Sequence, residues 1–183
     1  EGENLTENLE VRNQYKLYGS PDEYYKQEKE NYHNPHFKVV KKLLLQLKLE
    51  PATQSVIDLC CGNGEVTSVL SEIYPSVTFT GVDPYLNEVY ERKQKRNCLK
   101  LSFKELATDF EAFPQTNVIV CSFALHLCPT DLLPTILFNL ASKSKYLVIL
   151  TPNKKPEINQ FWDLIETQKE ERVTMKIYRS QIK

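Results

Sequence analysis

Residues 55–64 read Ser-Val-Ile-Asp-Leu-Cys-Cys-Gly-Asn-Gly, an apolar run that passes directly into a turn with two glycines. The run predicts a buried strand, because short continuous apolar segments are typical of strands covered on both faces. Gly62 and Gly64 let the backbone turn sharply and approach a ligand where any Cβ would be in the way. Residues 63–74 then carry apolar side chains at helical spacing, with Val66, Val69, Leu70 and Ile73 expected to face inward. The free N–H groups at that helix start favour a carboxylate or phosphate.

The alternation of strands and helices continues after this turn. Further strands are expected over residues 77–82, 99–103, 117–123, 146–150 and 172–178, the last as a half-buried edge strand. Further helices are expected over residues 86–96, 132–140 and 158–169. Such alternation with short connections predicts a doubly wound, mostly parallel α/β sheet of about six or seven strands with helices on both faces.

The N-terminal part of the chain is expected to form a helical lid. Ser20-Pro21-Asp22-Glu23 is a helix start, with Ser as N-cap and Pro at the first helical position. Asn34-Pro35 ends that helix and opens another, which carries Phe37, Val40, Leu44 and Leu47 on one stripe. These signals predict helices that close over the strand ends.

Length and composition fit one compact domain. The 183 residues include 41% apolar and 26% charged side chains, ordinary values for a globular protein. We expect residues 1–54 to form the lid, packed on a core over residues 55–183. No apolar run approaches the roughly 20 residues of a membrane span, and the polar N-terminus resembles neither a secretory signal nor a transit peptide. A cytoplasmic location without a membrane partner is therefore expected.

Charge and cysteine content argue against two classes of site. The formal net charge is −1, so nucleic acid is not indicated as a partner, and the basic run Arg92–Arg96 is interpreted as a solvated helix face. The five cysteines include no Cys-x-x-Cys pair, so no metal is expected. We interpret all five as reduced, small, buried apolar side chains.

Two acidic residues flank the turn. Asp58 lies inside the end of the first predicted strand, where a buried carboxylate needs a partner such as a cationic ligand group. Asp83 ends the second predicted strand, 19 residues after Gly64, near the roughly 20 expected between a nucleotide loop and the acid that binds the ribose. A nicotinamide-dependent oxidoreductase shares this geometry. Its loop, however, has a third glycine where this chain has Thr67, and it has no use for Asp58.

The segment from Asp58 to Gly64 resembles motif I of class I S-adenosylmethionine-dependent methyltransferases, commonly Asp-x-Gly-x-Gly-x-Gly, and Asp83 resembles their ribose acid. The resemblance covers about residues 55–151. It implies S-adenosylmethionine as cofactor, with its methionyl end on the first acid and the loop backbone and its ribose on Asp83. Cys60 stands where the family has its first glycine. Ser102-Phe103 stand where many members have an acid that contacts the adenine.

The candidate site residues follow from the strand ends and from this resemblance. The expected cofactor-binding residues are Asp58, Leu59, Cys60, Cys61, Gly62, Asn63, Gly64, Asp83, Pro84, Ser102, Phe103 and Cys121. Ser102 is expected to hydrogen-bond the adenine amino group and Phe103 to stack on the ring. His126 is the candidate general base, with a capping or packing histidine as the alternative. The expected substrate or lid residues are Tyr25, Tyr32, His36 and Asn153.

The expected function is methyl transfer, which requires mainly that the acceptor be aligned and water excluded. A small molecule is favoured as the acceptor. Enzymes that methylate adenine or glutamine amides often carry Asn/Asp-Pro-Pro-Tyr/Phe after the fourth strand, where this chain has Cys121-Ser122-Phe123-Ala124. We also expect no appended recognition domain. Tyr32-His33-Asn34-Pro35-His36 adds a resemblance to a small, functionally unassigned methyltransferase group. The alternative is a non-catalytic S-adenosylmethionine-binding or scaffold protein of the same fold.

Overall fold

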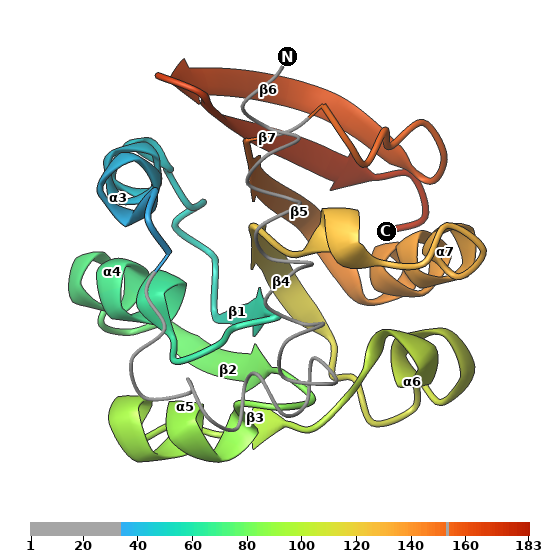
Figure 1. Ribbon diagram of the computed structural model, residues 1–183, viewed down its shortest axis with the longest axis horizontal. Coiled ribbons are helices and arrows are strands. Elements are labelled where there is room, and N and C mark those ends of the chain that lie inside the picture. The colour runs from blue at the N-terminus through green and yellow to red at the C-terminus, as the bar shows by residue number, and fades with distance from the viewer. Residues whose placement is uncertain (1–33, 153) are drawn as a thin grey trace, which may run out of the picture.

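The computed structural model describes residues 34–152 and 154–183 and shows one seven-stranded sheet in the order β3-β2-β1-β4-β5-β7-β6 (Figure 1). Five strands pair in parallel: β1 (Ser55–Leu59), β2 (Thr78–Val82), β3 (Cys98–Leu99), β4 (Thr116–Ser122) and β5 (Ser144–Thr151). β7 (Val173–Ser180) runs antiparallel to both β5 and β6 (Trp162–Glu170). The predicted doubly wound, mostly parallel α/β sheet is confirmed.

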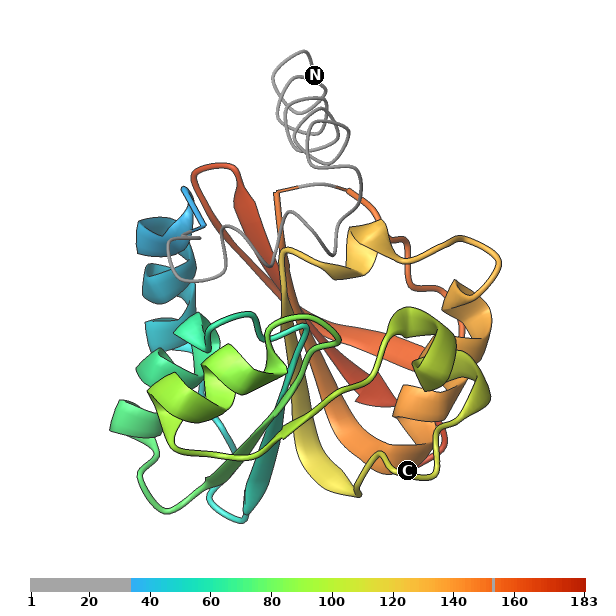
Figure 2. The same cartoon turned by 60° about the horizontal axis from the view of Figure 1, so that its bottom comes forward.

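Helices cover both faces of this sheet (Figures 1 and 2). One face carries α3 (Phe37–Gln46), α4 (Glu65–Ile73) and α5 (Asn87–Gln94), and the other carries α6 (Phe103–Thr108) and α7 (Leu133–Lys143). A separate cluster of buried side chains fills each interface, because neighbouring residues of a strand point to opposite faces. Val56 belongs to the cluster under α3 and α4, and Ile57 belongs to the cluster under α7.

The direction of chain progress reverses beside β1. From β1 the chain moves outward through β2 to β3, then returns to β4 on the other side of β1 and continues to β5. At such a switch point the connecting loops diverge and leave a crevice at the carboxyl ends of the strands. The turn after β1 and the loops after β2 and β4 therefore meet at one place.

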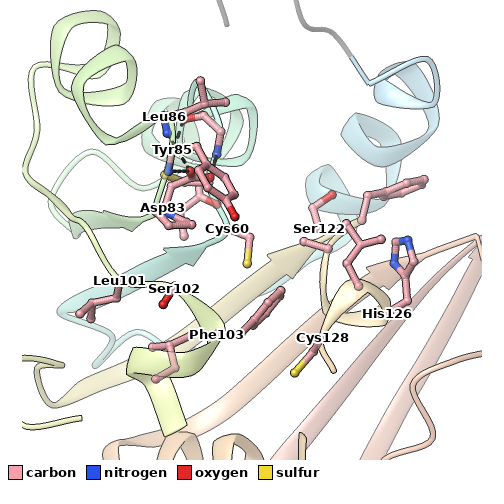
Figure 3. A pocket seen from close by; sticks show the side chains of 18 of the residues that line it. Cys60, Asp83, Tyr85, Leu86, Leu101, Ser102, Phe103, Ser122, His126 and Cys128 are labelled. Carbon is pink, nitrogen blue, oxygen red and sulfur yellow. Dashed lines mark hydrogen bonds between the residues drawn. The ribbon is translucent and has the colours of Figure 1, made fainter. Parts of the chain in front are cut away.

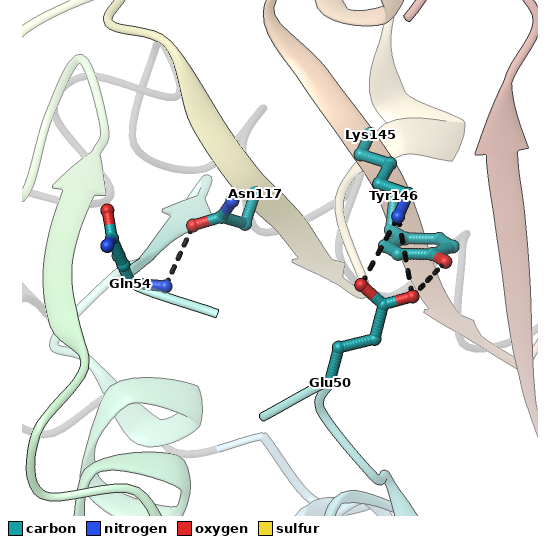
Figure 4. A network of polar contacts seen from close by, with 5 residues as sticks. All are labelled: Glu50, Gln54, Asn117, Lys145 and Tyr146. Atoms are coloured by element: carbon teal, nitrogen blue, oxygen red, sulfur yellow. Dashed lines mark hydrogen bonds and ion pairs between the residues drawn. The ribbon is translucent and has the colours of Figure 1, made fainter. Parts of the chain in front are cut away.

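The opposite end of the sheet anchors the segment between α3 and β1 (Figure 4). The Asn117 side-chain oxygen accepts hydrogen bonds from the N–H groups of Gln54 at 2.8 Å and Ser55 at 3.0 Å. Glu50 accepts a hydrogen bond from the Tyr146 hydroxyl and lies 3.3 Å from the Lys145 ammonium. Because these three partners lie on β4 and β5, the contacts hold the segment that joins α3 to β1 against the sheet.

The predicted helix over residues 158–169 is wrong, because β6 begins at Trp162. Most side chains of β6 are exposed, so the strand lacks the alternating burial that would distinguish it in the sequence. Its pairing partner β7 supplies the backbone hydrogen bonds that a helix would otherwise provide. β7 was in turn predicted as an edge strand, but it lies between β5 and β6.

Two smaller predictions also need correction. The strand expected over residues 99–103 is only Cys98–Leu99, and Phe103 begins α6, a helix that was not predicted. Ser102 caps this helix: its hydroxyl accepts the Glu105 N–H at 3.2 Å, and the Glu105 carboxylate accepts the Ser102 N–H at 3.2 Å. This Ser-x-x-Glu capping box was the available signal. In α4, Ile73 was expected to face inward but is 39% exposed.

The predicted lid includes residues 1–33, which lie outside the described residues. Its described part, α3, packs beside α4 on the face of the sheet, and Asn34 and Val40 near its N-terminal end reach the crevice. Within residues 34–152 and 154–183, no helix is both long enough and apolar enough to cross a membrane.

Candidate functional site

A pocket of about 760 Å³ opens at the carboxyl ends of β1, β2 and β4 (Figure 3). At one end it is lined by residues 60–63 of the glycine loop (residues 60–64) and by the loop after β2, and at the other end by residues after β4. The structure brings these predicted residues together in its wall: Asp58, Cys60, Cys61, Gly62, Asn63, Asp83, Pro84, Ser102, Phe103 and His126. Residues far apart in the sequence thus share one cavity.

The remaining predicted residues lie elsewhere. Leu59 and Cys121 are buried in the core on the α7 side of the sheet, and Gly64 is buried at the N-cap of α4. His36 is the N-cap of α3, and its ring stacks on Phe123 with the centroids 5.3 Å apart. Phe123 itself lines the pocket, so His36 supports the wall from behind. Tyr25, Tyr32 and Asn153 lie outside the described residues.

The glycine loop turns through three left-handed residues. Cys60, Gly62 and Gly64 have φ values of 55°, 54° and 91°. A Cβ built on Gly62 would contact only Leu86, at 3.8 Å, so the space beside this glycine is pocket rather than protein. Cys60 holds the same backbone conformation with a side chain, which costs about 1 kcal/mol relative to glycine. Figure 3 shows Cys60 between Asp83 and Phe103.

Asp83 joins the glycine loop to the end of β2. Its carboxylate is 7% exposed and accepts three backbone hydrogen bonds, from Gly62 at 3.0 Å and from Tyr85 and Leu86 at 2.8 Å each. A carboxylate has about four acceptor positions, so capacity is left for a ligand hydroxyl. Asp83 therefore shapes the loop and also lines the pocket.

Asp58 is 2% exposed at the end of β1, and its partner is Thr67 of α4. The Thr67 hydroxyl donates to Asp58 at 2.7 Å and the Thr67 N–H donates at 3.2 Å. Burial raises the pKa of Asp58 to about 7, while the hydrogen bonds from Thr67 act in the opposite direction. The Thr67 hydroxyl also lies 2.9 Å from that of Tyr90. The sequence did not reveal this role of Thr67, three residues after Gly64.

The other end of the pocket is apolar and contains one histidine. Its apolar side chains include Phe103, Leu106, Phe123, Leu127, Cys128 and Leu132. The Nδ1 atom of His126 is buried and has no hydrogen-bond partner among the described residues. Burial lowers the pKa of His126, which favours a neutral imidazole. Of the described residues after β4 that line the pocket, none is acidic, so this end suits a ligand without positive charge.

The five cysteines are free thiols. Cys61, Cys121 and Cys128 are buried as expected, whereas Cys60 and Cys98 are only half-buried, which corrects the expectation that all five are buried. The sulfur atoms of Cys61 and Cys98 lie 3.6 Å apart. Within the part of the chain that the structure describes, no three His, Cys, Asp or Glu side chains cluster in a way that could hold a metal ion.

Several known proteins are similar to this chain. An uncharacterized protein of Schizosaccharomyces pombe is 29% identical, over 77% of this chain and 74% of its own length. The mitomycin 7-O-methyltransferase MmcR has a similar structure, with a TM-score of 0.69 at 11% identity, over 91% of this chain and 60% of its own. The N-methyltransferase NodS of Bradyrhizobium japonicum, in complex with S-adenosylhomocysteine, has a TM-score of 0.64 at 14% identity. That similarity covers 93% of this chain and 97% of NodS.

The structural similarities agree with the fold derived above, with its crevice at the switch point beside β1. This chain spans about 60% of the length of MmcR, so only part of that protein is matched. At the level of sequence, residues 30–180 match the family described as the methyltransferase domain. Since this match covers most of the chain, the protein belongs to the methyltransferase-domain family.

Proposed function

We propose that the protein transfers a methyl group from S-adenosylmethionine to a small-molecule acceptor. The observation that carries the proposal is the pairing of Gly62 and Asp83 in the pocket wall. Gly62 leaves open space where a Cβ would stand, and the Asp83 carboxylate lies beside it with capacity for a further hydrogen bond. The similarity to NodS, which holds S-adenosylhomocysteine, supports this choice of ligand.

The residues of the loop end fit this cofactor. Asp83 would accept a ribose hydroxyl, and Asp58 would pair with the methionyl ammonium, which gives a buried carboxylate its counter-charge. Phe103 would stack on the adenine. Ser102 already donates to the Glu105 carboxylate at 2.9 Å but keeps a lone pair that can accept from the adenine amino group. When bound, the cofactor supplies a methyl group on a positively charged sulfur.

The apolar end of the pocket indicates the chemistry of the acceptor. A buried amine would need to lose a proton or find an acid, and no described residue after β4 provides an acid in the wall. A hydroxyl on an apolar body fits better, because Leu127 and Leu132 can pack on the body. The neutral imidazole of His126 can then take the hydroxyl proton as the oxygen accepts the methyl group. The apolar wall also excludes water and so prevents side reactions.

Calorimetric titration tests the cofactor assignment. We expect S-adenosylmethionine and S-adenosylhomocysteine to bind and NAD not to bind; binding of NAD alone would overturn the proposal. Transfer of a labelled methyl group is then followed into a panel of phenols, aliphatic alcohols and aliphatic amines. We expect label in hydroxyl compounds and loss of about 100-fold or more in kcat for His126→Gln, with unchanged affinity for S-adenosylhomocysteine. Cofactor binding without transfer to any panel member would support the non-catalytic scaffold instead.

A further inference from the structure

Gln94, the last residue of α5, reaches across to the glycine loop. Its side-chain nitrogen lies 3.0 Å from the carbonyl oxygen of Asn63, 3.1 Å from that of Gly64 and 2.8 Å from the hydroxyl oxygen of Ser68. The two hydrogens of this amide are thus shared among three acceptors, two of which belong to the loop backbone. No motif in the sequence marks Gln94.

Gly64 has the space for this contact only because it lacks a side chain. A Cβ built on Gly64 would lie 2.6 Å from the Cγ and the nitrogen of the Gln94 side chain, closer than real contacts allow. Gly64 does not line the pocket, unlike Gly62. The second glycine of the loop therefore makes room for Gln94, whereas the first makes room in the pocket.

The segment that leads from the end of β2 through α5 therefore holds the glycine loop from two sides. Asp83, at the end of β2, accepts the N–H of Gly62, and Gln94, at the end of α5, donates to the carbonyls of Asn63 and Gly64. Because a peptide group is planar, fixing a carbonyl also fixes the direction of the N–H on the far side of the same peptide. The N–H of Gly64 donates to the Cys61 carbonyl at 2.9 Å and so closes the turn, and the N–H of Glu65 belongs to the first residue of α4, which lines the pocket.

We infer that Gln94 is a positioning residue for the cofactor loop. Its amide holds the Asn63 and Gly64 peptides and with them the turn against which the methionyl end of S-adenosylmethionine binds, an inference that rests on the proposed function. Without Gln94, the Asn63 carbonyl loses this donor, the Gly64 carbonyl keeps the Ser68 N–H, and the loop samples other orientations. Cofactor affinity then falls, although Gln94 itself does not touch the pocket.

The substitution Gln94→Glu tests this inference, because it keeps the shape of the side chain and places acceptor oxygens against carbonyl oxygens. At pH 8 we expect the Kd for S-adenosylhomocysteine to rise by about fivefold to tenfold relative to the unmodified protein. The ratio of the two Kd values should shrink as the pH falls to 5, because the introduced carboxyl, once protonated, donates one hydrogen bond. Glu65 and Lys93 border the same surface hollow in both proteins, so the unmodified protein is measured at each pH as the reference.

Ser68→Ala is the matched control, because it removes the third acceptor of the same amide without freeing the loop carbonyls. We expect it to leave the Kd within about twofold, since Ser68 is exposed on α4. If Ser68→Ala and Gln94→Glu raise the Kd equally, Gln94 acts only through its contact with α4, and the inference is overturned. If circular dichroism shows that Gln94→Glu is unfolded, Gln94→Met takes its place, with the same loss at pH 8 and no change of the ratio with pH.

The outcome separates this inference from the proposed function. If the unmodified protein binds S-adenosylhomocysteine and Gln94→Glu binds it equally well at pH 8, the positioning role is wrong and the proposed function stands. If the unmodified, folded protein does not bind S-adenosylhomocysteine, the proposed function fails and the inference fails with it.

Discussion

The backbone N–H of Gly62 donates a hydrogen bond to the carboxylate of Asp83 at 3.0 Å and so joins the turn after β1 to the end of β2. The same carboxylate accepts the N–H groups of Tyr85 and Leu86. One side chain therefore organises both loops at the mouth of the pocket. Under the proposed function it also binds the ribose, so changes to Asp83 act on stability and on binding together.

Asp83→Ala should affect both properties. The free energy of unfolding should fall by about 1–3 kcal/mol, because one buried and two partly buried N–H groups lose their acceptor. The Kd for S-adenosylhomocysteine should rise roughly a hundredfold. Denaturant unfolding and calorimetric titration measure the two effects. Asp109→Asn, at an exposed helix end, is the control; unchanged affinity in folded Asp83→Ala would remove Asp83 from the cofactor site.

The affinity for the cofactor should depend on pH through Asp58. Its pKa is raised to about 7 by burial, so below pH 7 the carboxyl is mostly protonated and must lose a proton to pair with the ligand ammonium. Affinity for S-adenosylhomocysteine should therefore rise from pH 6 to pH 7, by at most about tenfold per unit. At strongly alkaline pH it should fall, because the amino group of the ligand then loses its charge.

Asp58→Asn provides the comparison for this pH profile. Because the amide does not titrate, the acid limb of the profile should disappear while the alkaline limb remains. Affinity at pH 7.5 should also be lower than in the unmodified protein. A profile with the same acid limb in both proteins would show that another group is responsible.

The two loop glycines should respond differently to alanine. Gly64→Ala should lower the free energy of unfolding more than Gly62→Ala, because the new Cβ meets Gln94 at 2.6 Å in addition to the strain of a positive φ. Gly62→Ala should cost only about 1 kcal/mol of stability from the backbone strain. It should nevertheless weaken cofactor binding, since its Cβ enters the pocket. Equal stability losses for the two variants would contradict the difference in their surroundings.

The position of β6 can be checked through Trp162, the only tryptophan of the chain. Its side chain is 2% exposed and its indole N–H donates to the Leu137 carbonyl at 3.0 Å. Trp162→Phe should lower the free energy of unfolding by about 1–3 kcal/mol, as followed by far-ultraviolet circular dichroism. Leu164→Ala, at an exposed residue of the same strand, should change it by less than about 0.5 kcal/mol. Similar effects of both changes would argue against β6 as described.

Local patterns in the sequence were sufficient for the elements that build the parallel half of the sheet. Each of these patterns has a local physical cause. The apolar run of β1 reflects burial on both faces, and the two glycines after it reflect a positive φ. The acid at Asp83 reflects the need for a ligand or for hydrogen-bond donors. These features predicted the mostly parallel sheet and the residues of the glycine loop and of Asp83 that line the pocket. β6 was misassigned because an edge strand with mostly exposed side chains has no periodicity to detect.

Contacts between distant residues were decided only by the tertiary structure. Thr67 supports Asp58, and Gln94 reaches Gly64, because α4 and α5 pack on the same face of the sheet; no spacing along the chain encodes either contact. The lone Nδ1 of His126 likewise depends on which side chains surround it. Burial, hydrogen-bond partners and pKa are properties of an assembled environment, whereas turn and helix signals are properties of a few consecutive residues. The sequence by itself therefore determined where a ligand loop occurs, and folding determined what holds that loop in place.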